Sequence, residues 1–331
     1  MRAPVILLLA LWLTGCGEQP PTNLQLDSGG APLTAVLSHD GSQALFSSTA
    51  WGLQLWQVAN GEPRYRWTLD AGNQVLTAAM AEDGSVAVTA ETSRFAIWDL
   101  QQGENLGFYT AEGSPIRDIA ISNGGRHVLI GQSNGIATHI DLDSGRRLQF
   151  VAHQHKADSI ESAVTTVAMS ANGRYCLTGG YDGNAFLWDS SNGQIVHAFR
   201  YRSGVIKVAL ERMGRYAFIA DTSNNGVIWD LRTATPVSEL QFKRRQLIIT
   251  SARFNDDGSQ LLTGSPGRQL RLWSVADGKL LAEHQVATRR ELRPDGAAVL
   301  DVAFGADGRL WSASSSGYVE YWPAPTGAQQ P

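Results

Sequence analysis

Two histidines close to an aspartate are the strongest local candidate for metal chemistry in this sequence. His153, His155 and Asp158 lie close together in the chain, and imidazole and carboxylate groups are ligands that zinc and related ions accept. Lys156 stands among them and this stretch holds no third histidine, so we expect a solvated loop here. The sequence contains no Gly-x-Ser-x-Gly nucleophile turn, phosphate-binding loop or paired-cysteine zinc spacing. It therefore predicts no catalytic residue, no metal and no cofactor.

A second reactive group, the thiol of Cys16, ends a segment that is typical of secretion signals. Arg2 precedes the apolar run 5–13, and small residues follow that run. Nine apolar residues span roughly 14 Å as a helix, about half the hydrocarbon core of a bilayer, so a permanent membrane span is not expected. We expect residues 1–15 to be removed as a signal peptide.

The residues before the thiol, Leu13-Thr14-Gly15-Cys16, resemble the lipobox of bacterial lipoproteins. In that family the cysteine is acylated and becomes the new N-terminus, which implies lipid attachment at Cys16 and a short linker over 16–22. Gly17 follows where an aspartate is associated with retention in the inner membrane. The resemblance implies a lipid-anchored protein that faces the periplasm, with the outer membrane favoured over the inner.

Composition limits the partners and the covalent chemistry. The chain holds 27 basic and 31 acidic residues, a formal net charge of −4, which disfavours generic nucleic-acid binding. Cys176 is the other cysteine, so an acylated Cys16 leaves no intramolecular disulfide. Because Cys176 lies in the apolar run Tyr175-Cys176-Leu177, we expect it to be buried.

A repeat fills most of the sequence, and its strands must position any functional side chain. An Asp-Gly or Asn-Gly type of turn recurs at Gly41, Gly84, Gly124, Gly173, Gly214, Gly258 and Gly308. A strand follows each turn and ends at an equivalent residue, at Trp56, Trp98, Ile140, Trp188, Trp229, Trp273 and Trp322. Glycine supplies the positive φ of tight hairpins, and four short strands separated by turns fit into each unit.

Three of these units end in Trp-Asp, at Trp98-Asp99, Trp188-Asp189 and Trp229-Asp230. With a unit length of 41 to 49 residues, the chain resembles the WD40-repeat family of β-propellers. The resemblance covers residues 23–322 and implies an all-β fold, a seven-bladed propeller of four-stranded blades. The repeated tryptophans then fill the space between blades. The Gly-His dipeptide, which helps build the family's Asp-His-Ser-Trp hydrogen-bond network, has no counterpart here, which leaves that network without its histidine.

The two ends of the repeat complement each other. The seventh unit stops at Trp322-Pro323 without a fourth strand, whereas a spare strand, residues 23–27, precedes the first unit. In the WD40 family the N-terminal strand completes the last blade, and a closed ring has no open sheet edge. We therefore expect the propeller over 23–323 and a C-terminal tail over 324–331.

The loops provide the candidate site. In WD40 order, loops that enter the first strand of each blade share one face with loops that join its second and third strands. Candidate partner-binding residues on that face are Arg200, Arg202, Lys243, Arg244, Arg245, Arg289, Arg290, Trp51 and Tyr181. Basic loops gathered on part of an acidic protein suggest a polarised binding surface, and exposed aromatic residues often anchor interfaces. Solvated loops that happen to be charged are the alternative.

From these observations we expect a non-catalytic protein-interaction scaffold in the cell envelope, bound to envelope proteins. One alternative is an assembly factor similar to the propeller lipoprotein of the outer-membrane β-barrel assembly machinery, because turns such as Asp277-Gly278-Lys279 also resemble those of quinoprotein-like propellers. Eight blades would favour that alternative. A periplasmic propeller hydrolase or lyase would need acidic and histidine side chains in the channel, whereas inner strands such as Ile119-Ala120-Ile121 are mostly apolar. Binding of anionic envelope glycans is a third alternative.

Overall fold

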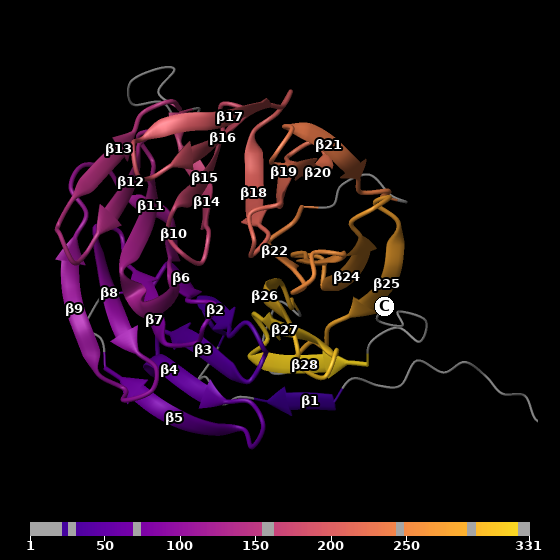
Figure 1. The fold of residues 1–331 in the computed structure, drawn as a ribbon. Helices are drawn as coiled ribbons and strands as arrows, with labels where there is room; N and C mark the ends of the chain where they lie inside the picture. Colours follow the sequence, from indigo (N-terminus) through magenta and orange to yellow (C-terminus); the bar gives the residue numbers. More distant parts are fainter. Residues whose placement is uncertain are drawn as a thin grey trace, which may run out of the picture.

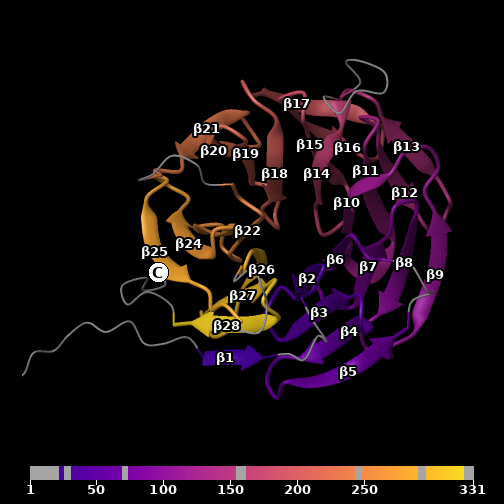
Figure 2. The same cartoon turned by 180° about the vertical axis from the view of Figure 1, so that it is seen from behind.

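Short runs of β-branched and aromatic residues form strands throughout the chain, and turns rich in glycine separate them. The structure is a computed structural model and describes residues 22–25, 31–68, 74–153, 162–242, 248–289 and 296–323. Its strands form seven four-stranded antiparallel sheets arranged as blades around a central axis (Figure 1). The view from behind shows the same ring with β1 beside β28 (Figure 2). The fold is therefore the expected all-β, seven-bladed propeller.

Each blade is numbered by its place along the chain, and in blades one to six the strands run in sequence order from the axis to the rim. The strands of the first three blades are β2 (Thr34–Leu37), β3 (Gln43–Ser48), β4 (Gly52–Gln57), β5 (Glu62–Trp67); β6 (Thr77–Met80), β7 (Val86–Ala90), β8 (Arg94–Asp99), β9 (Asn105–Thr110); β10 (Ile116–Ile121), β11 (His127–Gln132), β12 (Ala137–Asp141) and β13 (Arg147–Phe150). The strands of blades four to six are β14 (Val164–Met169), β15 (Tyr175–Gly180), β16 (Asn184–Asp189), β17 (Gln194–Arg200); β18 (Val205–Leu210), β19 (Tyr216–Asp221), β20 (Gly226–Asp230), β21 (Thr235–Glu239); β22 (Ser251–Phe254), β23 (Gln260–Gly264), β24 (Gln269–Ser274) and β25 (Leu280–Gln285). A 3-10 turn, η1 (Asn123–Gly125), joins β10 to β11.

The seventh blade joins the two ends of the chain. It consists of β26 (Val299–Phe304), β27 (Leu310–Ser314), β28 (Tyr318–Trp322) and the N-terminal strand β1 (Thr22–Gln25). β1 pairs antiparallel with β28, with Thr22 opposite Tyr321 and Gln25 opposite Tyr318. The expected closure by the N-terminal strand is confirmed, and it gives β28 a partner where the sheet would otherwise end.

The hydrophobic core lies between the blades. One cluster of buried side chains fills each of the seven junctions between neighbouring blades. A large apolar residue at or next to the end of each third strand packs toward the preceding blade, at Trp56, Trp98, Ile140, Trp188, Trp229, Trp273 and Trp322. The repeat tryptophans therefore fill the space between blades, as expected.

Two smaller expectations concern cysteine chemistry and the membrane. Cys176 is fully buried in the junction between blades three and four, and burial raises the pKa of its thiol. It is therefore a packed apolar side chain rather than a nucleophile. Within the described ranges, no helix has the length and apolar character needed to cross a bilayer. Cys16 and the segment before it lie outside the described residues.

Some turn glycines also allow close contact between blades. Gly278, in the turn between β24 and β25, has a φ of +67°, and a Cβ at this position would overlap the carbonyl oxygen of Glu239 in blade five. Its own carbonyl accepts a hydrogen bond of 2.9 Å from the backbone N–H of Gln241. This turn thus helps to join blades five and six.

We expect Gly278→Ala to lower the free energy of unfolding by about 2–4 kcal/mol, because it combines a strained φ with an overlap on backbone atoms. Gly145→Ala is the matched control, since Gly145 has a φ of +71° and nothing within 4 Å of its Cβ position. It should cost only about 1 kcal/mol, from backbone strain. Urea unfolding followed by circular dichroism measures both. Equal losses would contradict the proposed role of the Gly278 contact.

Candidate partner-binding face and central channel

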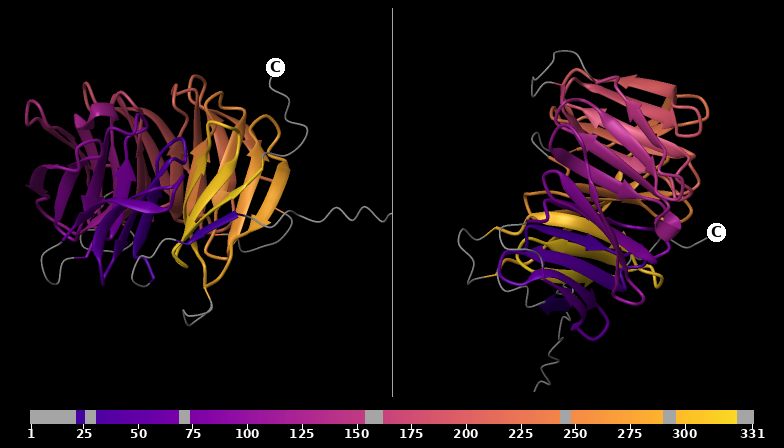
Figure 3. Two further views of the ribbon diagram at one scale, coloured as in Figure 1. Left: turned by 90° about the horizontal axis from the view of Figure 1, so that it is seen from below. Right: turned by 90° about the vertical axis from the view of Figure 1, so that its left-hand side faces the viewer.

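Two sets of loops form one face of the ring, which we call the entry face. The first set leads into the inner strand of each blade and the second joins its second and third strands. Backbone hydrogen bonds connect the two sets, for example from Ser133 to Pro115 at 3.0 Å, and from Thr222 to Gly204 at 2.9 Å. Edge-on views show the two faces of the ring (Figure 3). The predicted grouping of these loops on one face is therefore present.

Large apolar side chains are unevenly distributed between the two faces. On the entry face, the exposed ones within the described ranges are Leu33, Trp51, Leu76, Val151, Tyr181 and Ile248. In the turns of the opposite face, the corresponding exposed side chain in those ranges is Met213. Others, such as Phe108 and Ile195, lie on outer strands at the rim. Exposed apolar groups gathered on one face are typical of a binding surface.

The predicted site residues are spread around this face. Trp51 lies between β3 and β4, and its ring is 4.4 Å from the guanidinium of Arg66. Tyr181 lies between β15 and β16 and is 48% exposed.

The predicted basic residues fall into two groups. Arg200 ends β17, Arg202 follows it in the next loop, and both are exposed. Arg289 is half-buried in the connection from β25 to β26. Lys243, Arg244, Arg245 and Arg290 lie outside the described residues, so the full basic cluster remains a prediction.

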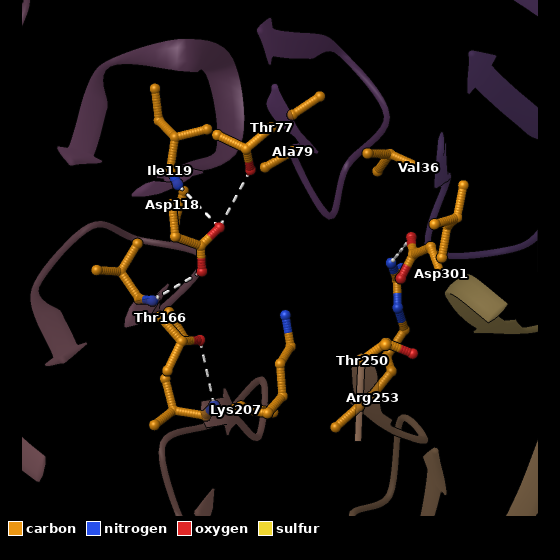
Figure 4. Close-up of a pocket in the computed structure, with 18 of the residues that line it drawn as sticks. Val36, Thr77, Ala79, Asp118, Ile119, Thr166, Lys207, Thr250, Arg253 and Asp301 are labelled. Carbon is orange, nitrogen blue, oxygen red and sulfur yellow. Dashed lines mark hydrogen bonds and ion pairs between the residues drawn. The ribbon is translucent and has the colours of Figure 1, made fainter. Parts of the chain in front are cut away.

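A cavity of about 510 Å³ occupies the central channel and is lined by the inner strands of all seven blades. Figure 4 shows polar side chains around its wall. One polar residue stands at the same register position of each inner strand, seven positions before a turn glycine, which in blade three is Gly125 rather than Gly124: Thr34, Thr77, Asp118, Thr166, Lys207, Ser251 and Asp301. We call these residues the polar ring, and all of them except Ser251 line the cavity. The inner strands were expected to be mostly apolar, so the ring was not predicted, although its spacing from the glycines is regular.

Several ring members connect neighbouring blades. Asp118 accepts hydrogen bonds from the Thr77 hydroxyl at 3.2 Å and from the backbone N–H of Val167 at 2.9 Å. Thr166 accepts one from the backbone N–H of Val208 at 3.3 Å. Blades two to five are thus linked near the axis by side chains that bond to the next inner strand (Figure 4).

Asp301 links the two ends of the repeat in the same way. It accepts hydrogen bonds from the backbone N–H of Leu37 at 2.9 Å and from the Arg253 guanidinium at 3.0 Å. Arg253 also donates to the carbonyl of Leu37 at 3.3 Å. Blades six, seven and one therefore meet at one carboxylate.

Charged side chains also cross the axis near the opposite face. His39 Nε2 lies 2.6 Å from Asp256 Oδ1, which connects blades one and six. Arg212 lies 3.6 Å from Glu82 and 3.8 Å from Asp256, which connects blades two and five to the same group. Burial raises the pKa of Glu82. Blade one is not a neighbour of blade six, nor is blade two a neighbour of blade five, so the His39–Asp256 and Arg212–Glu82 contacts narrow this end of the channel.

A buried polar network runs through blade four. His153 lies 3.0 Å from Asp182 through Nδ1 and 2.9 Å from the Thr178 hydroxyl through Nε2. The indole N–H of Trp188 donates to the same hydroxyl at 3.0 Å. Burial would raise the pKa of Asp182, but hydrogen bonds from His153 and Asn184 outweigh it and lower that pKa. Both ring nitrogens of His153 are therefore engaged within the protein.

Comparison with known families agrees with this geometry. The family model described as "WD domain, G-beta repeat" matches residues 148–189, which include most of blade four, and residues 236–274, which extend through β24. The chain is a WD40-like β-propeller. Its seven blades agree with that family rather than with the eight-bladed alternative.

Similarity to curated proteins is low and partial. The propeller is 25% identical over 172 residues to the U3 small nucleolar RNA-associated protein 21 homolog of Schizosaccharomyces pombe, covering 52% of this chain and 18% of that protein. It is 26% identical over 171 residues to Autophagy-related protein 16 of Arabidopsis thaliana, covering 51% and 32%. It is 27% identical over 126 residues to the small ribosomal subunit protein RACK1y of Oryza sativa subsp. japonica, covering 37% of each. The chain thus spans well under half the length of these relatives.

The blade-four network corrects the sequence analysis. Asp182, His153, Thr178 and Trp188 form the family network for which no histidine was expected, with threonine in the serine position. His153 was missed because alanine, not glycine, precedes it, and because it stands 29 residues before Asp182. It was expected in a solvated loop, whereas it is fully buried, and its two hydrogen bonds leave neither ring nitrogen available to a metal ion. Within the described ranges, no group of three His, Cys, Asp or Glu side chains could hold a metal ion.

Another pair of histidines, which the sequence did not connect, lies in blade three. The rings of His127 and His139 stack with centroids 5.1 Å apart. Burial lowers the pKa of both, that of His139 to about 4. Two imidazoles with lowered pKa values pack as neutral rings near pH 7.

Two buried threonines at equivalent positions allow a test of the network. Thr178→Val should lower the free energy of unfolding by about 2–4 kcal/mol, because it leaves the indole N–H of Trp188 and Nε2 of His153 without a buried partner. In blade two, Thr89 accepts only the indole N–H of Trp98, at 2.8 Å. Thr89→Val should cost about 1–2 kcal/mol. Urea unfolding of both variants measures the difference, and a Thr89→Val loss as large as that of Thr178→Val would contradict the extra role of His153.

Proposed function

We propose that this propeller is a non-catalytic scaffold of the bacterial cell envelope, anchored through a lipid on Cys16, which binds an envelope protein on its entry face. The observation that carries the proposal is the gathering of exposed apolar side chains on that face. Burial of such side chains is a main favourable contribution to protein association. A rigid ring that presents many loops on one face suits this role.

Charge on the entry face supports the choice of partner type. Arg200 and Arg202 are exposed in blades four and five, whereas Glu112 is exposed in the loop that enters blade three. A face with opposite charges on different sectors guides a partner of complementary pattern and sets its orientation. A protein surface provides both the apolar contacts and this pattern, whereas a glycan would engage mainly the basic sector.

The hydrogen bonds that the channel carboxylates accept within the protein support a non-catalytic role. Asp118 accepts hydrogen bonds from Thr77 and from two backbone N–H groups, and Asp301 pairs with Arg253 and Leu37. A general acid or base must exchange protons with a substrate, which these bonded carboxylates are poorly placed to do.

The direction of β1 supports an orientation for the anchored protein. Because β1 runs antiparallel to β28, Thr22 lies beside Tyr321, at the end of β28 next to the opposite face. The chain therefore enters the propeller from the side away from the entry face. Six residues from Cys16 to Thr22 reach about 20 Å when extended. A lipid on Cys16 would hold the opposite face toward the membrane and leave the entry face open to the periplasm.

Affinity capture from detergent-solubilised envelopes tests the binding face. The face variant carries Leu33→Ser, Leu76→Ser and Tyr181→Ser, and the matched control carries Phe108→Ser, Ile195→Ser and Met213→Ser away from that face. Loss of about 1–2 kcal/mol per apolar contact predicts at least a hundredfold weaker capture of a defined partner by the face variant. The control should bind like the unmodified protein. Equal retention by both variants, or equal loss, would argue against the entry face.

Cys16→Ala tests the anchor. Intact protein should partition into the detergent phase of a phase-separating detergent and carry the added mass of acyl chains, because each buried CH₂ contributes about 0.8 kcal/mol to membrane binding. The variant should carry no added acyl mass and partition into the aqueous phase. Lipid mass on the variant, or none on the intact protein, would refute lipidation at this residue.

A further inference from the structure

Lys207 breaks the pattern of the polar ring. Asp118, Thr166 and Asp301 occupy the same register position and accept hydrogen bonds from the next blade. Lys207 is the one lysine at this position, and its ammonium makes no hydrogen bond or ion pair with any residue of the described ranges. Figure 4 shows its side chain extending into the cavity, away from the dashed contacts. At this position other residues link neighbouring blades, whereas in blade five Lys207 directs its charge into the channel.

The channel lining does not neutralise this charge. The cavity wall carries Arg117, Lys207 and Arg253 against Asp118 and Asp301. Asp301 is paired with Arg253, and Asp118 accepts three hydrogen bonds. Lys207 is half-buried, and an anion in the cavity would give its ammonium a charged hydrogen-bond partner.

The cavity has the size and access that a bound group needs. Its volume of about 510 Å³ lies within the roughly 300–1,000 Å³ of typical ligand sites. Alanines such as Ala35, Ala79 and Ala168 line it and leave room around the amine. The lining reaches exposed Ile248 on the entry face, whereas His39, Asp256, Glu82 and Arg212 narrow the other end. A ligand therefore enters from the entry face.

We propose that the central channel binds a carboxylate group at Lys207. A singly charged carboxylate fits because the cations of the cavity wall, Arg117, Lys207 and Arg253, exceed its carboxylates by one charge. Those carboxylates, Asp118 and Asp301, would repel a multiply charged phosphate. The hydroxyl of Thr34 also lines the cavity and has no hydrogen-bond partner within the described ranges. The carboxylate comes either from a free small organic acid or from an acidic side chain of a partner's loop. The second source rests on the proposed scaffold function, and the first does not.

Lysine NMR provides a direct test, because the chain contains four lysines, Lys156, Lys207, Lys243 and Lys279. Reductive methylation with ¹³C-formaldehyde labels each amine and keeps its charge, and Lys207→Arg identifies the Lys207 signal. Propionate, which carries one charge, and the peptide acetyl-Gly-Glu-Gly-amide are the two probes. Propionamide and the matching glutamine peptide are their neutral controls at equal ionic strength.

We expect a saturable shift of the Lys207 signal with at least one acidic probe and none with its neutral control. Lys279, which pairs with Asp277 at 2.6 Å on the surface, should not shift. Saturation by propionate alone assigns a free acid, and saturation by the glutamate peptide alone assigns a partner side chain. No saturable shift with either probe, or equal shifts at Lys207 and Lys279, would overturn the proposal.

Calorimetry on unlabelled protein adds a second readout. Lys207→Met keeps the apolar stem and should weaken binding of the active probe at least tenfold, whereas Lys279→Met should leave it unchanged. Unchanged binding by Lys207→Met would also overturn the proposal. The variants that test the entry face do not alter the polar ring, so a failed titration leaves the scaffold proposal standing, and a failed capture leaves the channel site standing.

Discussion

The need to bury both faces of every blade is the constraint on which this structure depends. A four-stranded sheet of this size cannot be stable alone, because each of its faces carries apolar side chains that must be covered. Each blade is covered by its two neighbours, so the chain must return to its starting point before the last face is buried. Pairing of β1 with β28 completes blade seven, and the cluster around Trp56 and Ala313 joins that blade to blade one. Closure is thus part of the core.

The same constraint explains where polar groups can stand. Tryptophans and aliphatic residues occupy the junctions, which leaves the inner strands and the loops as the places where chemistry varies. On the inner strands, a side chain at the ring position reaches the backbone of the next blade, as Asp118 does with Val167. Replacing such a residue by lysine in blade five removes one link between blades and directs a charge into the channel. Junction packing supplies enough stability for this exchange to be tolerated, since Phe218 and Trp273 remain buried between blades five and six.

Much of the fold could be predicted because its signals are local. Turn glycines such as Gly173 and strand ends such as Trp188 recur with the blade period, and the missing fourth strand of the last unit indicated closure by the N-terminus. The links within the channel could not be predicted in the same way, because they join residues from different blades. His39 and Asp256 meet across the axis, although 217 positions separate them. The role of His153 depended on its spatial relation to Asp182, which no neighbouring residue reveals. Of the predicted binding residues, Trp51, Tyr181, Arg200 and Arg202 are exposed on the expected face, but exposure does not identify a partner.

The entry face and the opposite face of the ring differ in a way that suits the proposed scaffold role. Charged contacts near the axis narrow the channel toward the opposite face, and the chain enters the propeller from that same side through β1. The wider mouth of the channel and the exposed apolar side chains therefore lie on the same face, the one that points away from the proposed lipid. A partner on the entry face would cover the mouth of the channel as well as Leu33, Leu76 and Ile248. Burial of these side chains would exclude water from the mouth and strengthen any contact with Lys207, because a charge interaction increases as the local dielectric falls. Binding on the entry face and binding in the channel would then be coupled, since each event would exclude water from the other site.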